Sequence, residues 1–353
     1  MLDKISLGIG DSRVENFLSY TVTADLYEAA DAFSMELADT GVEIKTGMRC
    51  ELRVNDQLEL TGIVDKVTRG NGIVPGKQGS GQGVDIGVKN KLIVSGRDLM
   101  GLLVDSYCEK FGDITVKDPK VLAEQLLKDI PFINREKIIY QEEKKEEKED
   151  RIKVDPGSKV FDVLKDYAAS MGLLFYAEPD GTVVFGAPKT EGNPKYELVR
   201  RKDGRGNNII SGNITDDISE RYSKVTVMGQ RQDPVWSDIS VNVPDKEDEG
   251  KEEYKFPFYK PFVIFNGNIG DEKDAKRQAK NLIKKQRLKG VILAYKVAGH
   301  AYNGVNWTIN EFCQVADDVA GVNGSYLIMK RTFKLSRQGA FTELELGLPG
   351  RLQ

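Results

Sequence analysis

The stretch "VSGRDLMGLLVDSY", residues 94–107, is where the chain changes its hydrophobic period. Before it, polar and apolar residues alternate, which is typical of half-buried strands. After it, Leu99, Leu102 and Leu103 fall on one face of a helix. Asp98 therefore fits the position that caps a helix, where a carboxylate accepts hydrogen bonds from free N–H groups. Arg97 has two interpretations, a pair with a neighbouring carboxylate or a contact across a subunit boundary.

The sequence on the N-terminal side of this stretch predicts a small antiparallel barrel or sandwich. Segments with period two follow one another, separated by turns or polar breaks. The segments include "FLSYTVTADL", "RCELRVND", "LELTGIVDKVTR" and "VDIGVKNKLIVSG". The glycine-rich run 70–85 lies between the last two and is expected to be a mobile hairpin loop. Its "GKQ" lacks the spacing of a phosphate-binding loop, so we expect no nucleotide there.

On the C-terminal side, the clearest local unit is "DPGSKVFDVLKDYAASMGLLFYAEPDGTVVF", residues 155–185. Pro156 and Ser158 are expected to start a helix and Gly172 to end it. A hairpin should then turn at residues 179–181, which are Pro-Asp-Gly. The buried stripe of this helix is predicted to consist of Val160, Phe161, Leu164, Tyr167 and Ala168.

The last third of the chain returns to strand patterns, interrupted by one helix predicted over residues 271–288. Ala275, Ala279, Leu282 and Ile283 give this helix a narrow apolar face, so most of its surface should meet water or a partner. Its cations outnumber its acids Asp271, Glu272 and Asp274. The cations are Lys273, Lys276, Arg277, Lys280, Lys284, Lys285, Arg287 and Lys289. We interpret the helix either as a solvated cover or as a docking surface for an acidic neighbour.

Two more segments are expected to be exposed and mobile. The charged run 142–150 resembles a solvated loop tip, and residues 232–262 form a long polar insertion with a second acidic run at 245–253.

The composition limits the function. The 353 residues carry 51 Lys and Arg against 55 Asp and Glu, a net charge of −4, which disfavours a general nucleic-acid binder. The three cysteines, Cys50, Cys108 and Cys313, are far apart and are expected to be buried thiols of a reducing compartment. No apolar run is long enough for a membrane span, so we expect a soluble protein made in the cytoplasm.

The sequence gives no sign of an active site. His300 is the only histidine, and a lone histidine at a strand end is expected to lie at the surface. No catalytic triad or metal cluster can be built from it, so we predict no catalytic, cofactor-binding or metal-binding residue. A carboxylate pair could still hydrolyse glycosides, although no pair is indicated.

In their order, these pieces resemble the baseplate hub proteins of Mu-like contractile phage tails, which are distantly related to the T-even phage hub. The likeness runs nearly from end to end, and the loops at 70–85, 142–150 and 232–262 depart from it. The matching stretches are "FSMEL", "VSGRDLMGLLVD", the 155–185 unit, "SERYSKVTVMGQ", "KPFVIF", "AKRQAKNLIKKQRLKGVILAYKVAG" and residues 307–352.

The resemblance implies a β-rich α+β fold with two similar small antiparallel β-barrel modules joined by an α/β region. We expect a first barrel at 1–98, which residues 191–216 could complete, and a connecting α/β domain at 99–190. A second barrel with the basic helix should occupy 217–353.

The resemblance also implies a structural, non-enzymatic function. Three copies would form a ring that adapts the sixfold tail tube to the threefold central spike, within a baseplate assembled in the bacterial cytoplasm. The expected partners are other copies of the chain, the spike, and tube or other baseplate proteins, and DNA could pass through the pore without specific binding. The candidate interface residues are Arg97, Lys276, Lys280 and Lys284.

Two other classes remain open. A tail-associated cell-wall hydrolase would lose activity against peptidoglycan when one carboxylate is mutated. A tandem oligonucleotide-binding-fold protein would show exposed aromatic residues between basic strands, whereas the basic residues here gather on the helix.

Overall fold

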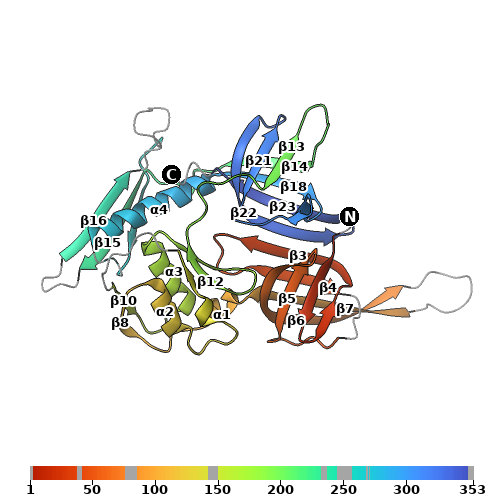
Figure 1. Ribbon diagram of the computed structural model, residues 1–353, viewed down its shortest axis with the longest axis horizontal. Coiled ribbons are helices and arrows are strands. Elements are labelled where there is room, and N and C mark those ends of the chain that lie inside the picture. The colour runs from red at the N-terminus through yellow and green to blue at the C-terminus, as the bar shows by residue number, and fades with distance from the viewer. Residues whose placement is uncertain are drawn as a thin grey trace, which may run out of the picture.

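The computed structural model describes residues 3–37, 42–75, 86–141, 150–231, 237–244, 257–267, 269 and 271–348. Figure 1 shows a β-rich molecule in which a large curved sheet lies beside a smaller α/β part. The larger sheet has 13 strands, and nearly all its strand pairs are antiparallel. Among the described residues, no helix combines the length and apolar character needed to cross a bilayer.

The N-terminal strands confirm the alternating pattern. Strands β4 and β5, and β3 from Tyr20 onward, bury every second side chain, because successive side chains point to opposite faces. The strands are β1 (Ile5–Ile9), β2 (Ser12–Val14), β3 (Phe17–Asp25), β4 (Ala32–Leu37), β5 (Arg49–Val54), β6 (Gln57–Pro75) and β7 (Ile86–Asp98). Their order in the sheet is β3-β4-β7-β6-β5-β1-β2.

The C-terminal strands belong to the same sheet, and their hydrogen-bonded order is β14-β18-β23-β22-β21-β13. They are β13 (Tyr196–Arg200), β14 (Ile209–Asp216), β18 (Val291–Ala298), β21 (Phe312–Asp317), β22 (Val322–Ser336) and β23 (Gly339–Gly347). A two-stranded hairpin, β19 (Ala301–Tyr302) and β20 (Val305–Asn306), lies between β18 and β21. Residues 191–216, considered above as completing the first barrel, instead supply β13 and β14 to this C-terminal group.

An antiparallel pair between β3 and β22 joins the two groups, and one hydrophobic core runs through both. Strand pairing in the described residues closes no barrel, so the expected arrangement of two barrels is not confirmed.

The α/β part has its own core, supplied almost wholly by residues 99–185. Its helices are α1 (Met100–Asp105), α2 (Pro119–Leu126) and α3 (Val160–Ser170), with a short 3-10 turn at Arg135–Lys137. Its strands are β8 (Gly112–Val116), β9 (Ile139–Tyr140), β10 (Asp150–Val154), β11 (Leu174–Ala177) and β12 (Val183–Gly186).

The predicted stripe of α3 is buried as expected, and β11 and β12 form the predicted hairpin. However, α3 starts at Val160 with Lys159 as its N-cap, later than Pro156 and Ser158 suggested. Gly172 follows the helix with φ +81°, a conformation that glycine adopts without a steric penalty.

A third unit consists of a three-stranded sheet covered by α4 (Glu272–Gly290). Its strands are β15 (Lys224–Arg231), β16 (Ser237–Pro244) and β17 (Pro261–Phe265). The Asp271 carboxylate accepts a hydrogen bond from Asp274 N at 2.8 Å and so caps α4. Ala275, Ala279 and Ile283 are buried against the sheet, which confirms the predicted apolar face.

Two loop predictions are partly wrong. The polar insertion 232–262 contains strand β16, and the glycine-rich run begins with Gly70–Pro75 as part of β6, paired with β7. Cross-strand hydrogen bonds hold both segments in extended form despite their weak strand propensity. The remaining predicted loop positions, 76–85, 142–149 and 245–253, lie outside the described residues.

Candidate protein interface

The N-terminal and C-terminal groups of strands have the same order. If β3, β4, β7, β6, β5 and β1 are matched with β14, β18, β23, β22, β21 and β13, every neighbour in one group corresponds to a neighbour in the other. The match also follows chain order in both groups. One difference is that β1 pairs antiparallel with β5, whereas β13 pairs parallel with β21. The sheet therefore contains one strand arrangement twice.

The irregularities of the two groups also coincide. The β6–β7 ladder shifts register between Val64 and Lys66, and the β22–β23 ladder shifts between Ile328 and Lys330. Similarly, β3–β4 shifts between Phe17 and Ser19, and β14–β18 shifts between Ile209 and Ser211. A bulge pins the register of a strand, so these shifts define which residues of the two groups correspond.

The turns that enter β5 and β21 correspond as well. Gly47 N donates to Val64 O at 2.8 Å, and Asn310 N donates to Ile328 O at 2.9 Å. Both turn residues have positive φ, +81° for Gly47 and +58° for Asn310, a conformation that favours glycine and asparagine. Two of the buried cysteines, Cys50 in β5 and Cys313 in β21, occupy matching positions.

The joint between the groups is a short ladder in which Lys330 to Leu335 of β22 pair with Asp25 to Tyr20 of β3. Lys330 Nζ lies 3.5 Å from Asp25 Oδ2, and the hydroxyl oxygens of Thr332 and Thr23 are 3.4 Å apart. Phe333 of this ladder is fully buried. The two groups are therefore joined by a strand ladder that buries Phe333 and carries an ion pair at one end.

A buried ion pair also links the two groups of strands next to this ladder. Arg331 is hydrogen-bonded through Nη1 to Glu59 of β6 and to the Trp307 carbonyl. Asn306 Nδ2 donates to the other oxygen of Glu59 at 2.5 Å. Because an unpaired buried charge is costly, this network couples β6 of one group to β22 of the other.

Two strand edges that match the joint have no strand partner in the described part of the chain. The β14 strand pairs only with β18, and β6 beyond Val64 pairs only with β7. Their counterparts are β3, which matches β14, and the second half of β22, which matches β6. These two counterparts pair with each other. An unpaired edge of this kind is a template for a further strand.

The predicted interface residue Arg97 has partners within its own chain. Its Nε lies 2.7 Å from Asp65 Oδ2, and its Nη2 lies 2.5 Å from Asp105 Oδ2. The guanidinium thereby ties the bulge of β6 to the end of α1. Asp98 accepts a hydrogen bond from Met100 N at 3.0 Å, as predicted for the helix start, although the formal N-cap is Leu99.

The predicted interface lysines lie on α4. Lys276 and Lys280 are exposed, whereas Lys284 is half-buried. Other cations of the helix have contacts within the chain: Arg277 Nε donates to Ser170 O at 2.8 Å, and the ammonium groups of Lys285 and Lys289 each lie 5.2 Å from the centre of the Tyr27 ring. Part of the basic surface therefore holds α4 against the rest of the molecule.

His300 is fully buried, so the prediction of a surface histidine is wrong. Thr342 Oγ1 donates to the Gly299 carbonyl at 2.5 Å and therefore accepts from His300 Nδ1 at 3.2 Å. His300 Nε2 is then the acceptor for the Tyr20 hydroxyl at 2.7 Å. Burial of this neutral ring lowers the pKa of His300 to about 4. The histidine belongs to the core, since β3 and β23 cover a residue that the sequence places beside a turn.

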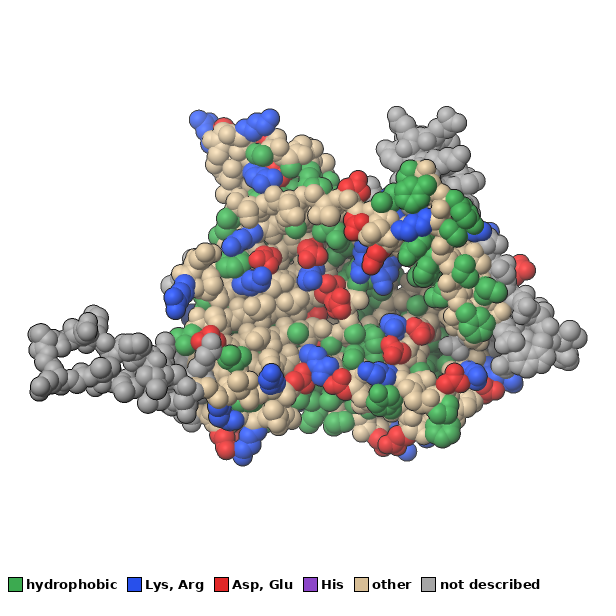
Figure 2. All heavy atoms as spheres, turned by 180° about the vertical axis from the view of Figure 1, so that it is seen from behind, with side chains coloured by type: hydrophobic (Ala, Val, Ile, Leu, Met, Phe, Trp, Pro, Cys, Tyr) green, Lys and Arg blue, Asp and Glu red, His purple; other side chains and the backbone are tan. Residues whose placement is uncertain are grey.

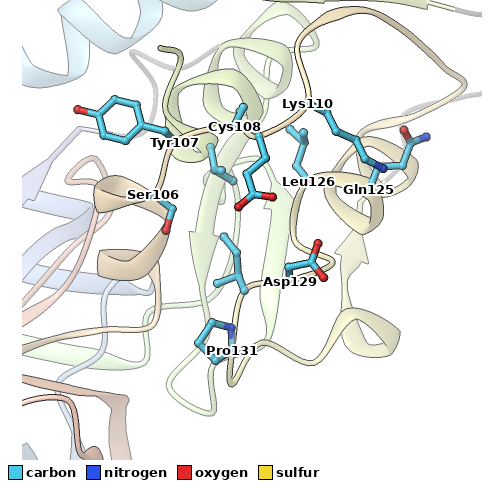
Figure 3. Close-up of a pocket in the computed structure, with 11 residues that line it drawn as sticks. Ser106, Tyr107, Cys108, Lys110, Gln125, Leu126, Asp129 and Pro131 are labelled. Atoms are coloured by element: carbon cyan, nitrogen blue, oxygen red, sulfur yellow. The ribbon is translucent and has the colours of Figure 1, made fainter. Parts of the chain in front are cut away.

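Two of the hollows in the described part of the chain are lined by polar side chains. The first, about 310 Å³, lies in the α/β part and is lined by Cys108, Gln125 and Asp129 among others; Figure 3 shows the Tyr107 ring pointing away from Gln125 and Asp129. Burial raises the pKa of the Cys108 thiol, which disfavours the reactive thiolate.

The second hollow, about 230 Å³, lies between the N-terminal strands, the α/β part and the C-terminal strands. It is lined by several carboxyl groups. Burial raises the pKa of Asp31 to about 6 and that of Asp98 well above its usual range. Both carboxylates accept backbone hydrogen bonds, from Asp25 N and Met100 N. No group of three or more His, Cys, Asp or Glu in the described ranges is arranged to hold a metal ion.

The surface carries no basic stripe on the face in Figure 2, where Lys and Arg alternate with Asp and Glu. Apolar side chains gather on one side of that view, and the exposed apolar residues of the β15–β17 sheet include Met228, Val263 and Phe265. Neither feature resembles the aromatic and basic groove of a single-strand binder.

Two family models match the chain. Residues 4–72 match the family described as "Mu phage baseplate assembly protein GpP-like, N-terminal", and residues 285–348 match the family described as "Tail protein, C-terminal domain". Together they cover β1 to most of β6 and β18 to β23. These matches confirm the resemblance to Mu-like baseplate proteins. The sequence matches none of the curated proteins with which it was compared.

Solved structures share the whole fold. The tail protein from Neisseria meningitidis MC58 superposes with a TM-score of 0.77 at 25% identity, covering 100% of this chain and 99% of that chain. The 43 kDa tail protein of prophage MuSo2 from Shewanella oneidensis superposes with a TM-score of 0.77 at 20% identity, covering 99% and 100%. The Escherichia coli c3393 protein, a type VI secretion component similar to bacteriophage T4 tail proteins, has a TM-score of 0.53 at 10% identity and covers 96% and 76%. The chain is related to phage tail and baseplate proteins.

Proposed function

We propose that this tail-related chain is a structural baseplate hub, three copies of which close into a ring between the sixfold tail tube and the threefold central spike. The observation that carries this proposal is the strand arrangement that occurs twice in one chain. Three chains then supply six similar groups of strands, so one end of the ring can match a sixfold partner while the chains themselves obey threefold symmetry.

In this proposal, each group of strands is one barrel-like module. The first module is 1–98, the α/β domain is 99–190, and the C-terminal part 217–353 carries the second module together with α4 and its small sheet. Strands β13 and β14 pair with the second module, so residues 191–216 are assigned to it. The ring has its place in the virion baseplate, and DNA passes through its pore without being bound specifically.

The proposed function needs no catalytic group. In the acidic hollow, Asp31 and Asp98 accept hydrogen bonds from backbone N–H groups and Glu59 binds the buried Arg331, which favours a structural role for these carboxyl groups over that of a cell-wall hydrolase. The mixed charges in Figure 2 favour protein partners over single-stranded nucleic acid.

The mass of the purified chain in solution tests the ring. Light scattering, alone and with the cognate spike protein, should give three copies of the 39.3 kDa chain, and electron micrographs of the complex should show a ring. A chain that stays monomeric at high concentration and forms no ring with its spike protein would contradict the proposal.

A further inference from the structure

We propose that neighbouring chains of this ring are joined by strand pairing between β14 of one copy and the second half of β6 of the next, in the register of the internal β3–β22 joint. The inference rests on the proposed ring and identifies its contact surface. It follows from the matched strands, because β14 corresponds to β3 and β6 corresponds to β22. A second copy of the chain is therefore the partner that each unpaired edge fits.

The register follows from the bulges. Aligning Val64 with Ile328 makes Lys66 equivalent to Lys330 and Thr68 equivalent to Thr332. Aligning Phe17 with Ile209 makes Thr23 equivalent to Thr215 and, two residues further, Asp25 equivalent to Asp217. The ladders β4–β7 and β18–β23 give the same alignment independently, because Glu36 pairs with Ile93 and Lys296 pairs with Glu343. All the ladders compared in the two groups therefore give the same pairs of equivalent residues.

The resulting contacts reproduce those of the internal joint. The Asp25–Lys330 ion pair becomes Asp217 with Lys66 of the next copy, and the Thr23–Thr332 pair becomes Thr215 with Thr68 of the next copy. The two aspartates are also alike locally. Asp25 accepts from Tyr27 N at 2.9 Å, and Asp217 accepts from Ser219 N at 2.7 Å, so each carboxylate is held by the N–H two residues on.

Val22 and Thr332 in the β3–β22 joint are buried, whereas their equivalents on the unpaired edges of β14 and β6 are exposed. This difference is expected if the two edges are contact surfaces that a single chain leaves uncovered. Val22 in the internal joint is 1% exposed, whereas its equivalent Ile214 is 43% exposed. Thr332 is 7% exposed, whereas Thr68, Lys66 and Arg69 are all exposed. Pairing of the two edges would cover these residues and satisfy the free backbone groups of both strands.

A cysteine pair tests the register. In a direct cross-strand pair the Cβ atoms are about 5 Å apart, close enough for a disulfide after small adjustments, whereas a diagonal pair is about 7 Å apart. The double variant Thr68→Cys, Thr215→Cys should therefore yield covalently closed trimers on mild oxidation at a concentration where the unmodified chain is trimeric. The native cysteines are buried and should give little background.

Two controls accompany this variant. Thr68→Cys with Asn213→Cys has the same number of new thiols in a diagonal position and should cross-link far less. Thr23→Cys with Thr332→Cys should form its disulfide within one chain and leave the mass unchanged under denaturing conditions. A trimer by light scattering without cross-linking at 68 and 215, or with equal cross-linking of the diagonal pair, overturns the register and leaves the hub proposal standing. A chain that neither cross-links nor forms trimers with its spike protein overturns both.

Discussion

At the scale of single residues, the chemistry of the charged pair at 97–98 is structural. Arg97 ties Asp65 to Asp105, and Asp98 accepts from the first N–H of α1. The sequence predicted the role of Asp98 because a helix start is a local feature. It left the partner of Arg97 open, because Asp65 lies 32 residues away and is brought near only by the β6–β7 pairing. A further role of Arg97 in a subunit contact stays a prediction.

His300 should make the stability of the protein depend on pH. Its folded pKa of about 4 lies below the ordinary value near 6.5, so the unfolded chain binds the proton more readily. The stabilisation is present above pH 6.5 and is lost as the pH falls toward 4, by up to about 3 kcal/mol. Denaturant unfolding at pH 7.5 and 5 should show a smaller pH effect in His300→Gln than in the unmodified chain.

The comparison between the two proteins isolates this histidine. Asp31, whose raised pKa acts in the opposite direction between pH 6 and 4, is present in both and cancels. An equal loss of stability on acidification in both proteins would show that His300 is not the cause.

At the scale of elements, α4 illustrates how a helix with a narrow apolar face is positioned. Its acids lie in the first turn, Asp271 caps it, and Ala275, Ala279 and Ile283 anchor it to the small sheet. The sequence could predict these features because they depend on the 3.6-residue period alone. It could not predict that Lys285 and Lys289 would lie over the Tyr27 ring, which belongs to a distant segment.

Reversing the charge of Lys276, Lys280 and Lys284 to Glu should slow assembly without unfolding the monomer. The first two side chains are exposed, and rim charges mainly set the association rate and its salt dependence. Stopped-flow light scattering with cognate tube and spike proteins at low salt would measure the rate. Circular dichroism would report the fold.

A matched control reverses three lysines elsewhere, Lys117, Lys128 and Lys202, which are exposed and give the same change in net charge. If both triple variants assemble at the unmodified rate, α4 only covers its sheet. If both are slowed equally, the effect comes from net charge and not from the helix.

At the scale of the whole molecule, one sheet carries two copies of the same strand arrangement, and the β3–β22 ladder joins them. A closed ring needs a different surface at each end of the chain, since the contact is heterologous. The unpaired edges of β14 and β6 supply two such surfaces. The joint inside the chain is thus the pattern for the proposed joints between chains.

Ile214→Arg should abolish trimer formation and leave the monomer folded. The side chain is 43% exposed in the single chain, so a charge there costs little before assembly, but the proposed register places it directly opposite Arg69 of the neighbouring copy, where two positive charges repel each other. Light scattering and thermal unfolding at several protein concentrations would separate the two effects, because only an assembling chain has a concentration-dependent Tm. Ile139→Arg, at a strand position 44% exposed in the α/β part, is the matched control and should still form trimers.

The sequence by itself determined the elements whose signals are local. The alternating strands, the stripe of α3, the 179–181 hairpin and the apolar face of α4 follow from periods of two and 3.6 residues and from turn residues. Its motif order also indicated the tail-protein resemblance. Only the tertiary structure decided that residues 191–216 join the C-terminal strands, that His300 is buried, and that β3 pairs with β22 across about 300 residues of chain. Such pairings depend on which strand edges meet in space, and residues far apart in sequence leave no periodic signal of that meeting.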